Sequence, residues 1–367
     1  MSSKQNTILA LTAATNASQL ALALLSEPQP IHSDPSSDFS VLRSDFLSLL
    51  ALLHSAVTKL SLSLKPSSPT YSASLSPLAD ISKHVSAAVH CVRLFRPEHG
   101  TTFFKEAQSL VRHVLEAILD LLSTFLDIIS RNDRTSTGQA GDEYMIRTAA
   151  IHDLIDIARG NNGLSSDNIS AVRKLLDRDY ATLEDGLHEL ADVIEQAEST
   201  NDEPELDDDG WDELGLGPTK FSVSDLQLAK KAYAILRFST TLYKRVTRDI
   251  LVPTFLSQYA PDQVNIHIDA LPHLFAILLV ASDDLIASIY TPQDVENIIT
   301  QLTAYKDVIQ QLQTSLEELL KADGQKEGAN GSQESKTNQW FNTCFGHTFK
   351  AIDALATTAA HQISSDH

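Results

Sequence analysis

The stretch NDEPELDDDGWDELGLGPT, residues 201–219, decides how the rest of the chain is organised. It is the second half of an acidic segment, residues 179–219, that holds 15 of the chain's 48 acidic residues and no Lys or Arg. Outside this segment 33 acids face 28 bases, so the net charge of −20 falls to −5. A run of like charges broken by Pro and Gly buries too little apolar surface to fold alone. We therefore predict a solvated acidic linker at 201–219 between two helical domains.

Length and composition indicate an all-helical protein. A chain of 367 residues is long enough for two domains with separate cores. Hydrophobic residues make up 43 % and aromatic residues only 6 %, which is typical of helix bundles built from Leu, Ile, Val and Ala. Cys91 and Cys344 lie in different halves without CxxC partners, which argues against a disulfide scaffold or a structural zinc site.

The N-terminus, the longest apolar run and the net charge indicate which targeting signals, membrane segments and partners to expect. The N-terminus has no basic stretch followed by a clean apolar core, so we expect no signal peptide. The most apolar run, Leu271–Ser282, is too short to span a bilayer. An isoelectric point near 4.9 makes nucleic acid and anionic membranes poor partners for the whole molecule. We expect neither as a partner.

Apolar residues three and four positions apart predict amphipathic helices throughout, and no run alternates with period two. We therefore predict an all-α fold of two antiparallel bundles. The first bundle, residues 1–200, holds five to six helices, predicted at 6–25, 38–64, 77–95, 101–131, 142–158 and 166–197. In the third of these, Ser76 is the expected N-cap and Pro77 the first helical residue.

The second bundle, residues 220–367, is predicted to hold four helices: 222–251, 264–290 with a break near Pro272, a helix entered through Thr291 and Pro292, and 340–363. In the first of these, apolar residues recur every seven positions on one face. Lys230, Arg237 and Lys244 recur at the same interval on the opposite face. We call these three bases the basic stripe.

No catalytic pattern with a convincing spacing is present, so we expect a protein that is not an enzyme and holds no cofactor or metal. The chain has no GxSxG, HExxH, Walker-type or GxGxxG motif. His267, Asp269 and His273 cluster around Pro272, but they lack the i, i+4 histidine pair that places two ligands on one helical face. Surface or core histidines are the favoured interpretation.

The basic stripe and the acidic linker are candidates for protein binding. Residues 220–251 carry seven bases and two acids directly after the acidic segment. The linker either folds back onto the stripe until a partner displaces it, or both stay solvated. In the linker, Leu206, Trp211, Leu214 and Leu216 form a candidate linear motif. Its Trp either anchors in an apolar pocket of a partner or packs on its own domain.

Several segments resemble the cyclin-D-binding protein family. The most specific similarity is SDDLIASIYTP, residues 282–292, which leads into the following helix. A second is VSAAV, residues 85–89, followed by a turn with Pro97 and Gly100 and a long helix from Thr101. The acidic segment, the Lys-containing helix after it and Trp340 at the start of the last helix are also similar in order and spacing. The chain resembles a divergent member, with a linker richer in aspartate.

The resemblance implies an all-helical, non-enzymatic regulator of nucleus and cytoplasm. Such a protein would bind D-type cyclins and helix-loop-helix factors and restrain cell-cycle progression. The runner-up is a vinculin- or catenin-like structural adaptor, because successive bundles of long amphipathic helices serve that purpose as well.

Overall fold

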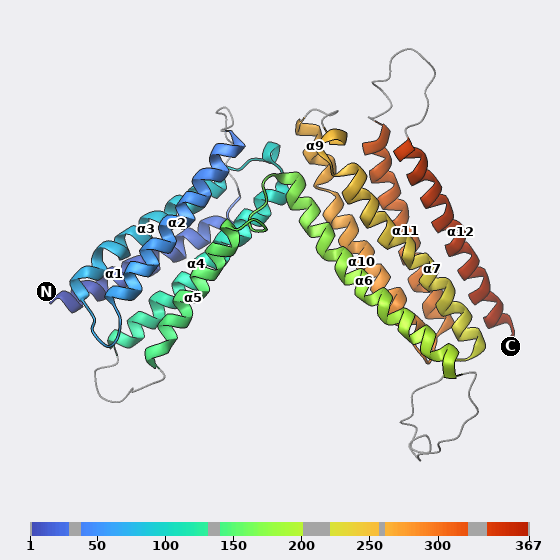
Figure 1. Ribbon diagram of the computed structural model, residues 1–367, viewed down its shortest axis with the longest axis horizontal. Helices are drawn as coiled ribbons and strands as arrows, with labels where there is room; N and C mark the ends of the chain where they lie inside the picture. Colours follow the sequence, from blue (N-terminus) through green and yellow to red (C-terminus); the bar gives the residue numbers. More distant parts are fainter. Residues whose placement is uncertain are drawn as a thin grey trace, which may run out of the picture. The chain divides into compact units, whose positions relative to one another are not determined.

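A computed structural model describes residues 2–28, 38–130, 140–200, 221–256, 261–321 and 336–365. All regular structure in these ranges is helical and none is strand, which confirms the predicted all-α fold. The chain divides into two compact units, Met1–Ala171 and Val172–His367. Figure 1 shows the long helices of each unit lying side by side.

The first unit is a closed ring of five long helices: α1 (Ser3–Ser26), α2 (Phe39–Ser63), α3 (Tyr71–Arg93), α4 (Thr101–Ser130) and α5 (Ala140–Arg159). Around the ring, α1 packs on α3, α3 on α2, α2 on α5, α5 on α4, and α4 on α1. Each helix thus turns one apolar stripe toward a common core, which includes the fully buried Leu50, Val85 and Ile118.

One end of this core is closed by aromatic rings and a turn that requires glycine. Phe39 and Phe95 lie with ring centroids 4.8 and 5.0 Å from that of Phe103. The side-chain carbonyl of Asn168 accepts a hydrogen bond from the Phe103 backbone N–H at 2.9 Å. Gly100 has φ 98°, and a Cβ there would stand 1.9 Å from Asn168 Cγ. The turn predicted from Pro97 and Gly100 therefore brings the start of α4 close to Asn168, the first residue of α6 (Asn168–Thr200).

The predicted start of the third helix at Pro77 is wrong, because α3 begins at Tyr71 and holds Pro77 in its interior. Contacts with α1 stabilise the additional turns. The Thr7 and Ser74 hydroxyls both donate to the Tyr71 carbonyl, at 2.9 and 2.7 Å, and lie 3.2 Å apart. Proline costs a helix one hydrogen bond and a steric adjustment, and the packed turn outweighs this. From the sequence alone we placed the helix start at Ser76 and Pro77, because they make a better N-terminal cap than the residues before Tyr71.

The second unit has five long helices and two short ones: α6 (Asn168–Thr200), α7 (Val223–Arg245), α8 (Pro253–Leu256), α9 (Pro261–Ile268), α10 (Leu271–Ile289), α11 (Val295–Lys321) and α12 (Lys336–Ser365). Here α7 packs on α12 and α10, and α11 packs on α10 and α12. Gly186 of α6 faces Ile286 of α10, and a Cβ there would meet the Ile286 side chain at 3.4 Å, an ordinary van der Waals contact. The break predicted near Pro272 is confirmed, because α10 starts with Pro272 in its first turn.

The boundary predicted at residue 200 differs from this division, because α6 joins the second unit after its first turn. Its side chains contact α7: Arg173 donates to the Thr247 carbonyl at 2.9 Å, and Glu184 lies 3.5 Å from Lys244 Nζ. The second unit therefore has five long helices where we predicted four. Residues 201–220, which include the predicted acidic linker, lie outside the described residues.

The predicted cap of the helix after Tyr290 is also wrong. We expected Thr291 to cap it and Pro292 to open it, but α11 starts at Val295. The carboxylate of Asp294 accepts from the backbone N–H groups of Glu296 and Asn297 at 3.0 and 3.3 Å, so Asp294 caps the helix. The Thr291–Pro292 peptide is cis and lies in the turn before it.

By length and composition alone, three described helical segments could cross a membrane: Ser3–Ser26, Phe39–Ser63 and Val264–Ile289. The last of these is longer than the apolar run that we judged too short. In the structure each segment also supplies fully buried side chains to a bundle core, among them Leu11, Leu50 and Leu278.

Two stacked histidines join α2 to α5. The rings of His54 and His152 lie 3.8 Å apart at 20°, and the Thr58 hydroxyl is 3.1 Å from His152 Nε2. Burial, and then the neighbouring His54, lower the pKa of His152 below its ordinary value, although Asp153 and Asp156 oppose this shift. The folded chain thus binds fewer protons than the unfolded chain just below the ordinary pKa of about 6.5.

We predict that the α2–α5 contact weakens in acid. The contribution of this contact to the free energy of unfolding is fully present above about pH 6.5 and is lost as the pH falls through the lowered pKa of His152. Hydrogen exchange of the α5 amides, corrected for intrinsic rates, should become faster as the pH is lowered from about 7.5 to about 5.5. His152→Phe keeps a stacked ring without the charge and should remove this dependence. The same change at the exposed His113 of α4 is the control; equal behaviour of both variants would refute the assignment.

Candidate functional site

The basic stripe lies on the outside of the second unit, on α7. Lys230, Arg237 and Lys244 are all exposed, while Leu228, Ile235 and Leu242 on the opposite face are fully buried. The amphipathic pattern predicted for this helix is therefore confirmed. The Ser222 hydroxyl caps α7 by accepting from the Asp225 backbone N–H at 3.0 Å, at the start that the sequence predicted.

Acidic residues of α6 face two of the three bases. Lys230 forms an ion pair with Glu198, and Lys244 Nζ lies 3.5 Å from Glu184. Glu198 near the end of α6 thus pairs with Lys230 in the first half of α7, and Glu184, earlier in α6, pairs with Lys244 at the end of α7. The two helices therefore run antiparallel. Arg237, between the two pairs, has its guanidinium carbon 6.0 Å from the Tyr233 ring centroid. None of the described carboxylates forms an ion pair with it.

These contacts bear on the fold-back hypothesis. Glu184 and Glu198 belong to the helical half of the acidic segment, so that half does reach the stripe. Leu206, Trp211, Leu214 and Leu216 lie outside the described residues.

The surroundings of Lys244 favour its charged form. Its ammonium lies 4.9 Å from the centroid of the Tyr180 ring, whose hydroxyl donates to Glu184. Contacts with the Tyr180 hydroxyl and with Glu184 raise the pKa of Lys244, and the hydrogen bond from Tyr180 lowers the pKa of Glu184. A lysine with a raised pKa is a poor general base or nucleophile. The cluster is suited to presenting charge.

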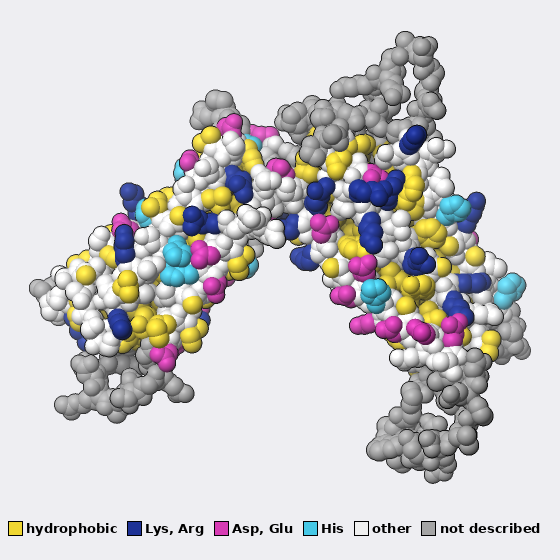
Figure 2. Space-filling view, viewed as in Figure 1, with side chains coloured by type: hydrophobic (Ala, Val, Ile, Leu, Met, Phe, Trp, Pro, Cys, Tyr) yellow, Lys and Arg dark blue, Asp and Glu magenta, His cyan; other side chains and the backbone are white. Residues whose placement is uncertain are grey.

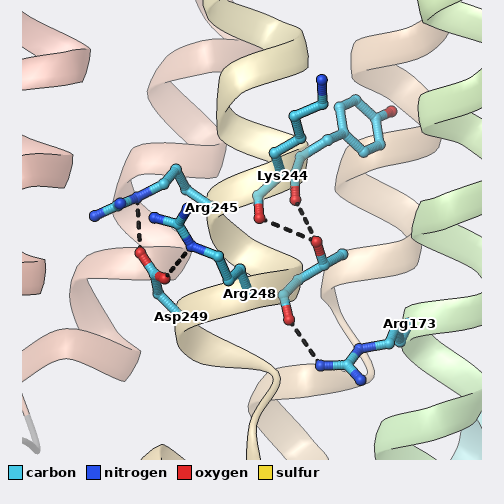
Figure 3. A network of polar contacts seen from close by, with 7 residues as sticks. Arg173, Lys244, Arg245, Arg248 and Asp249 are labelled. Atoms are coloured by element: carbon cyan, nitrogen blue, oxygen red, sulfur yellow. Dashed lines mark hydrogen bonds and ion pairs between the residues drawn. The ribbon is translucent and has the colours of Figure 1, made fainter.

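After Arg245, α7 widens into a π-helical turn, Val246–Ile250. Thr247 holds the turn: its hydroxyl lies 3.1 Å from the carbonyls of Tyr243 and Lys244. The guanidinium of Arg173 on α6 donates to the carbonyl of Thr247 at 2.9 Å (Figure 3). It also donates to the carbonyl of Leu251 at 2.9 Å. Arg173 thus satisfies carbonyls that the end of α7 leaves without helical donors.

One carboxylate in this turn holds two arginines. Asp249 Oδ2 lies 2.7 Å from Arg245 Nε, and its Oδ1 accepts from Arg248 Nε at 2.9 Å (Figure 3). The Arg245 guanidinium also lies over the Trp340 ring of α12, 4.3 Å from its centroid. The side chains of Arg245 and Asp249 are only 24 % and 17 % exposed, so this pair joins α7 to α12 in a partly dry environment.

Exposed bases gather where α6 begins and α7 ends. We call this group the basic end: Arg173, Lys174, Arg178, Lys244 and Arg248. Figure 2 shows Lys and Arg side chains concentrated over this part of the second unit, and Asp and Glu farther along toward the end of α6. The α6–α7 surface therefore changes sign along its length. Leu176, which follows the exposed Arg173 and Lys174, is fully buried and belongs to the core.

Sequence reasoning missed the basic end and the π-helical turn. The i, i+4 spacing of Arg245 and Asp249 was a signal for the ion pair. The contribution of α6 to the basic end was hidden because α6 was assigned to the other bundle. A π-helical turn has no comparable sequence signal.

The other sequence candidates show no reactive arrangement. His267 and Glu318 lie 4.0 Å apart, and in the part of the chain that the structure describes no three His, Cys, Asp or Glu could hold a metal ion. Cys91 and Cys344 are buried, and burial raises the pKa of each thiol to about 11. Both thiols are neutral near pH 7, as expected for small core residues.

Comparison with known families gives two matches. Residues 45–196 match the family model described as "Grap2 and cyclin-D-interacting, N-terminal", and residues 206–321 match "Grap2 and cyclin-D-interacting, C-terminal". The N-terminal model thus includes most of α6, which the structure places in the second unit. A search of curated proteins found no match.

We predict that Asp249→Asn destabilises the second unit by about 1–3 kcal/mol, because it leaves two arginines without their shared carboxylate. Urea unfolding followed by Trp340 fluorescence, in a Trp211→Phe background, measures the loss. Asp353→Asn is the matched control: its carboxylate is 65 % exposed and pairs with Lys306 at 2.8 Å, so we expect about 0–1 kcal/mol. Equal losses for the two variants would contradict the role of Asp249.

Proposed function

Because this chain belongs to the Grap2 and cyclin-D-interacting family, we propose that it is a non-enzymatic regulator that binds a D-type cyclin and restrains cell-cycle progression. The observation that carries the proposal is that the two matches follow one another along the chain and together cover most of it. Helix-loop-helix factors are further partners under this proposal, and the protein acts in the nucleus and the cytoplasm.

A role without catalysis is supported by the chemistry of the described side chains. Lys244 is held in its charged form by Tyr180 and Glu184, and both thiols are buried and neutral. Enzymes commonly have perturbed ionisable groups that converge in a cleft. Many of the perturbed groups here instead belong to core tyrosines, buried thiols and surface ion pairs.

The binding surface under this proposal is the basic stripe together with the basic end. The pairs of Lys230 with Glu198 and of Lys244 with Glu184 are exposed, and such pairs are worth about 0–1 kcal/mol. An acidic partner can therefore exchange with the α6 carboxylates at little cost. Arg237 lies between these pairs, so a partner's carboxylate can reach it without displacing an acid of α6.

The linear motif in the acidic segment is a second contact under the same proposal. Trp211 with Leu206, Leu214 and Leu216 would supply apolar anchors. The acids around them would disfavour docking on the protein's own acidic surfaces.

We predict that the purified chain binds a purified D-type cyclin and that Arg237→Glu weakens this binding about tenfold, because it places an acid opposite the partner's acids. Titration calorimetry measures the affinity. Lys59→Glu, an exposed base on α2, is the matched control and should leave the affinity unchanged. A form lacking residues 202–216 tests the linear motif.

Two results would refute the assignment. Absence of cyclin binding by the wild-type chain would refute the proposed function for this member of the family. Equal weakening by Arg237→Glu and Lys59→Glu would move the binding surface elsewhere. If the chain instead co-sediments with actin filaments, the structural-adaptor function replaces the regulator.

A further inference from the structure

The first unit carries an apolar groove between α1 and α3, apart from the surface proposed above. Ala17, Ala21 and Ser86 line it with small side chains, and Leu20, Leu24 and Val89 give it apolar walls. The groove encloses about 390 Å³, which is enough for two or three large side chains. It is therefore a concave, preformed surface of the kind that receives the side chains of a docked helix.

The groove exists because α1 turns its small residues inward and several of its leucines outward. Its buried face is Thr7, Leu11, Ala14, Ser18, Ala21 and Leu25. Leu20 and Leu24, four positions apart, are instead 67 % and 43 % exposed. Small inward residues let α1 approach α3 closely, and the large side chains remain at the edge of the groove. Covering them would bury apolar area worth about 25 cal/mol per Å².

Charge around the groove is opposite to that of the whole molecule. In a chain of net charge −20, α1 has no acid and one base, Lys4, and α3 has one acid, Asp80, against Lys83 and Arg93. Glu27, the C-cap of α1, adds one acid at the same end as Arg93. His90 and Arg93 line the groove itself at the C-terminal end of both helices. A partner that docks here would be complementary in charge if its flanks were acidic.

Arg93 is held in place before any partner arrives. Its Nη1 donates to the Leu24 carbonyl and lies 3.5 Å from the Glu27 carbonyl, and its Nη2 lies 3.3 Å from the Pro28 carbonyl. These contacts satisfy the end of α1 and fix a positive charge at one end of the groove. A fixed charge loses little side-chain entropy on binding, which favours the complex.

We propose that the α1–α3 groove is a docking site for an amphipathic helix of a partner protein, with large apolar side chains at i, i+3 and i+4 and acidic residues on its flanks. The i, i+4 spacing of Leu20 and Leu24, opposite Val89 and Arg93 on α3, matches the ridges of a third helix. Backbone N–H and C=O groups within α1 and α3 are already paired in their helices, so a partner segment cannot bind here by adding a β-strand.

The test uses two synthetic amphipathic helices, stapled to hold them helical, with identical leucine stripes. One has glutamates on its flanks and the other has lysines. Fluorescence anisotropy with the full chain should show binding of the glutamate form, about tenfold or more tighter than that of the lysine form. Leu20→Asp should weaken binding of the glutamate form about tenfold or more. Ile146→Asp, on α5 and also 67 % exposed, should leave it unchanged.

Several results would overturn the proposal. One is equal binding of the two peptides, and another is equal affinity of wild type and Leu20→Asp, with circular dichroism confirming that the variant is helical. Sedimentation showing a dimer that Leu20→Asp dissociates would mean that a second copy covers the groove. If the chain binds phosphatidylserine vesicles, and Leu20→Asp abolishes this binding while Ile146→Asp does not, the groove binds a lipid surface instead. Neither peptide contains cyclin sequence, so a failure here leaves the function proposed above untouched.

Discussion

The second unit depends on hydrogen bonds that buried hydroxyl groups of α7 make with neighbouring helices. This helix contacts α6, α10, α11 and α12. The Tyr243 hydroxyl donates to the Phe275 carbonyl of α10 at 2.5 Å, and the Ser239 hydroxyl is hydrogen-bonded to the Tyr305 hydroxyl of α11. Both tyrosines are fully buried, and burial raises their pKa values, so they remain neutral donors. A buried hydroxyl without a partner costs about 1–3 kcal/mol, so these bonds fix the rotation of α7 in the bundle. That rotation in turn places Lys230, Arg237 and Lys244 outside.

Local patterns in the sequence were sufficient for the fold class and for most helices. The spacing of Leu228, Ile235 and Leu242 identified the buried face of α7, and therefore the exposed bases opposite it. Two errors concern competition between local and tertiary preferences. Pro77 looks like a helix start, yet contacts of Thr7 with Tyr71 and Ser74 extend α3 beyond it. An apolar stripe shows that a helix is buried but not against which neighbour, and for this reason the sequence grouped α6 with the first bundle, whereas the structure groups it with the second unit.

The candidate site could be anticipated only in part, for a related physical reason. The three bases of the stripe lie on one helix, where a period is visible. The basic end combines Arg173 with Arg248, which are far apart in sequence and meet only through the antiparallel packing of α6 on α7. The two docking surfaces also differ in physical character. The α6–α7 surface offers exposed charge with exchangeable ion pairs, whereas the α1–α3 groove offers apolar walls and one fixed arginine. They therefore suit partners of different chemistry.

The connection between α6 and α7 has an evolutionary consequence. Packing and ion pairs such as that of Glu198 with Lys230 already hold these helices together, so the fold does not depend on a particular connecting sequence. Doubling the length of a flexible loop costs only about 0.6 kcal/mol. Selection can therefore lengthen, shorten or recharge this segment with little penalty to the fold. Changes in the length or charge of this connection therefore leave the packing of α6 against α7 unchanged.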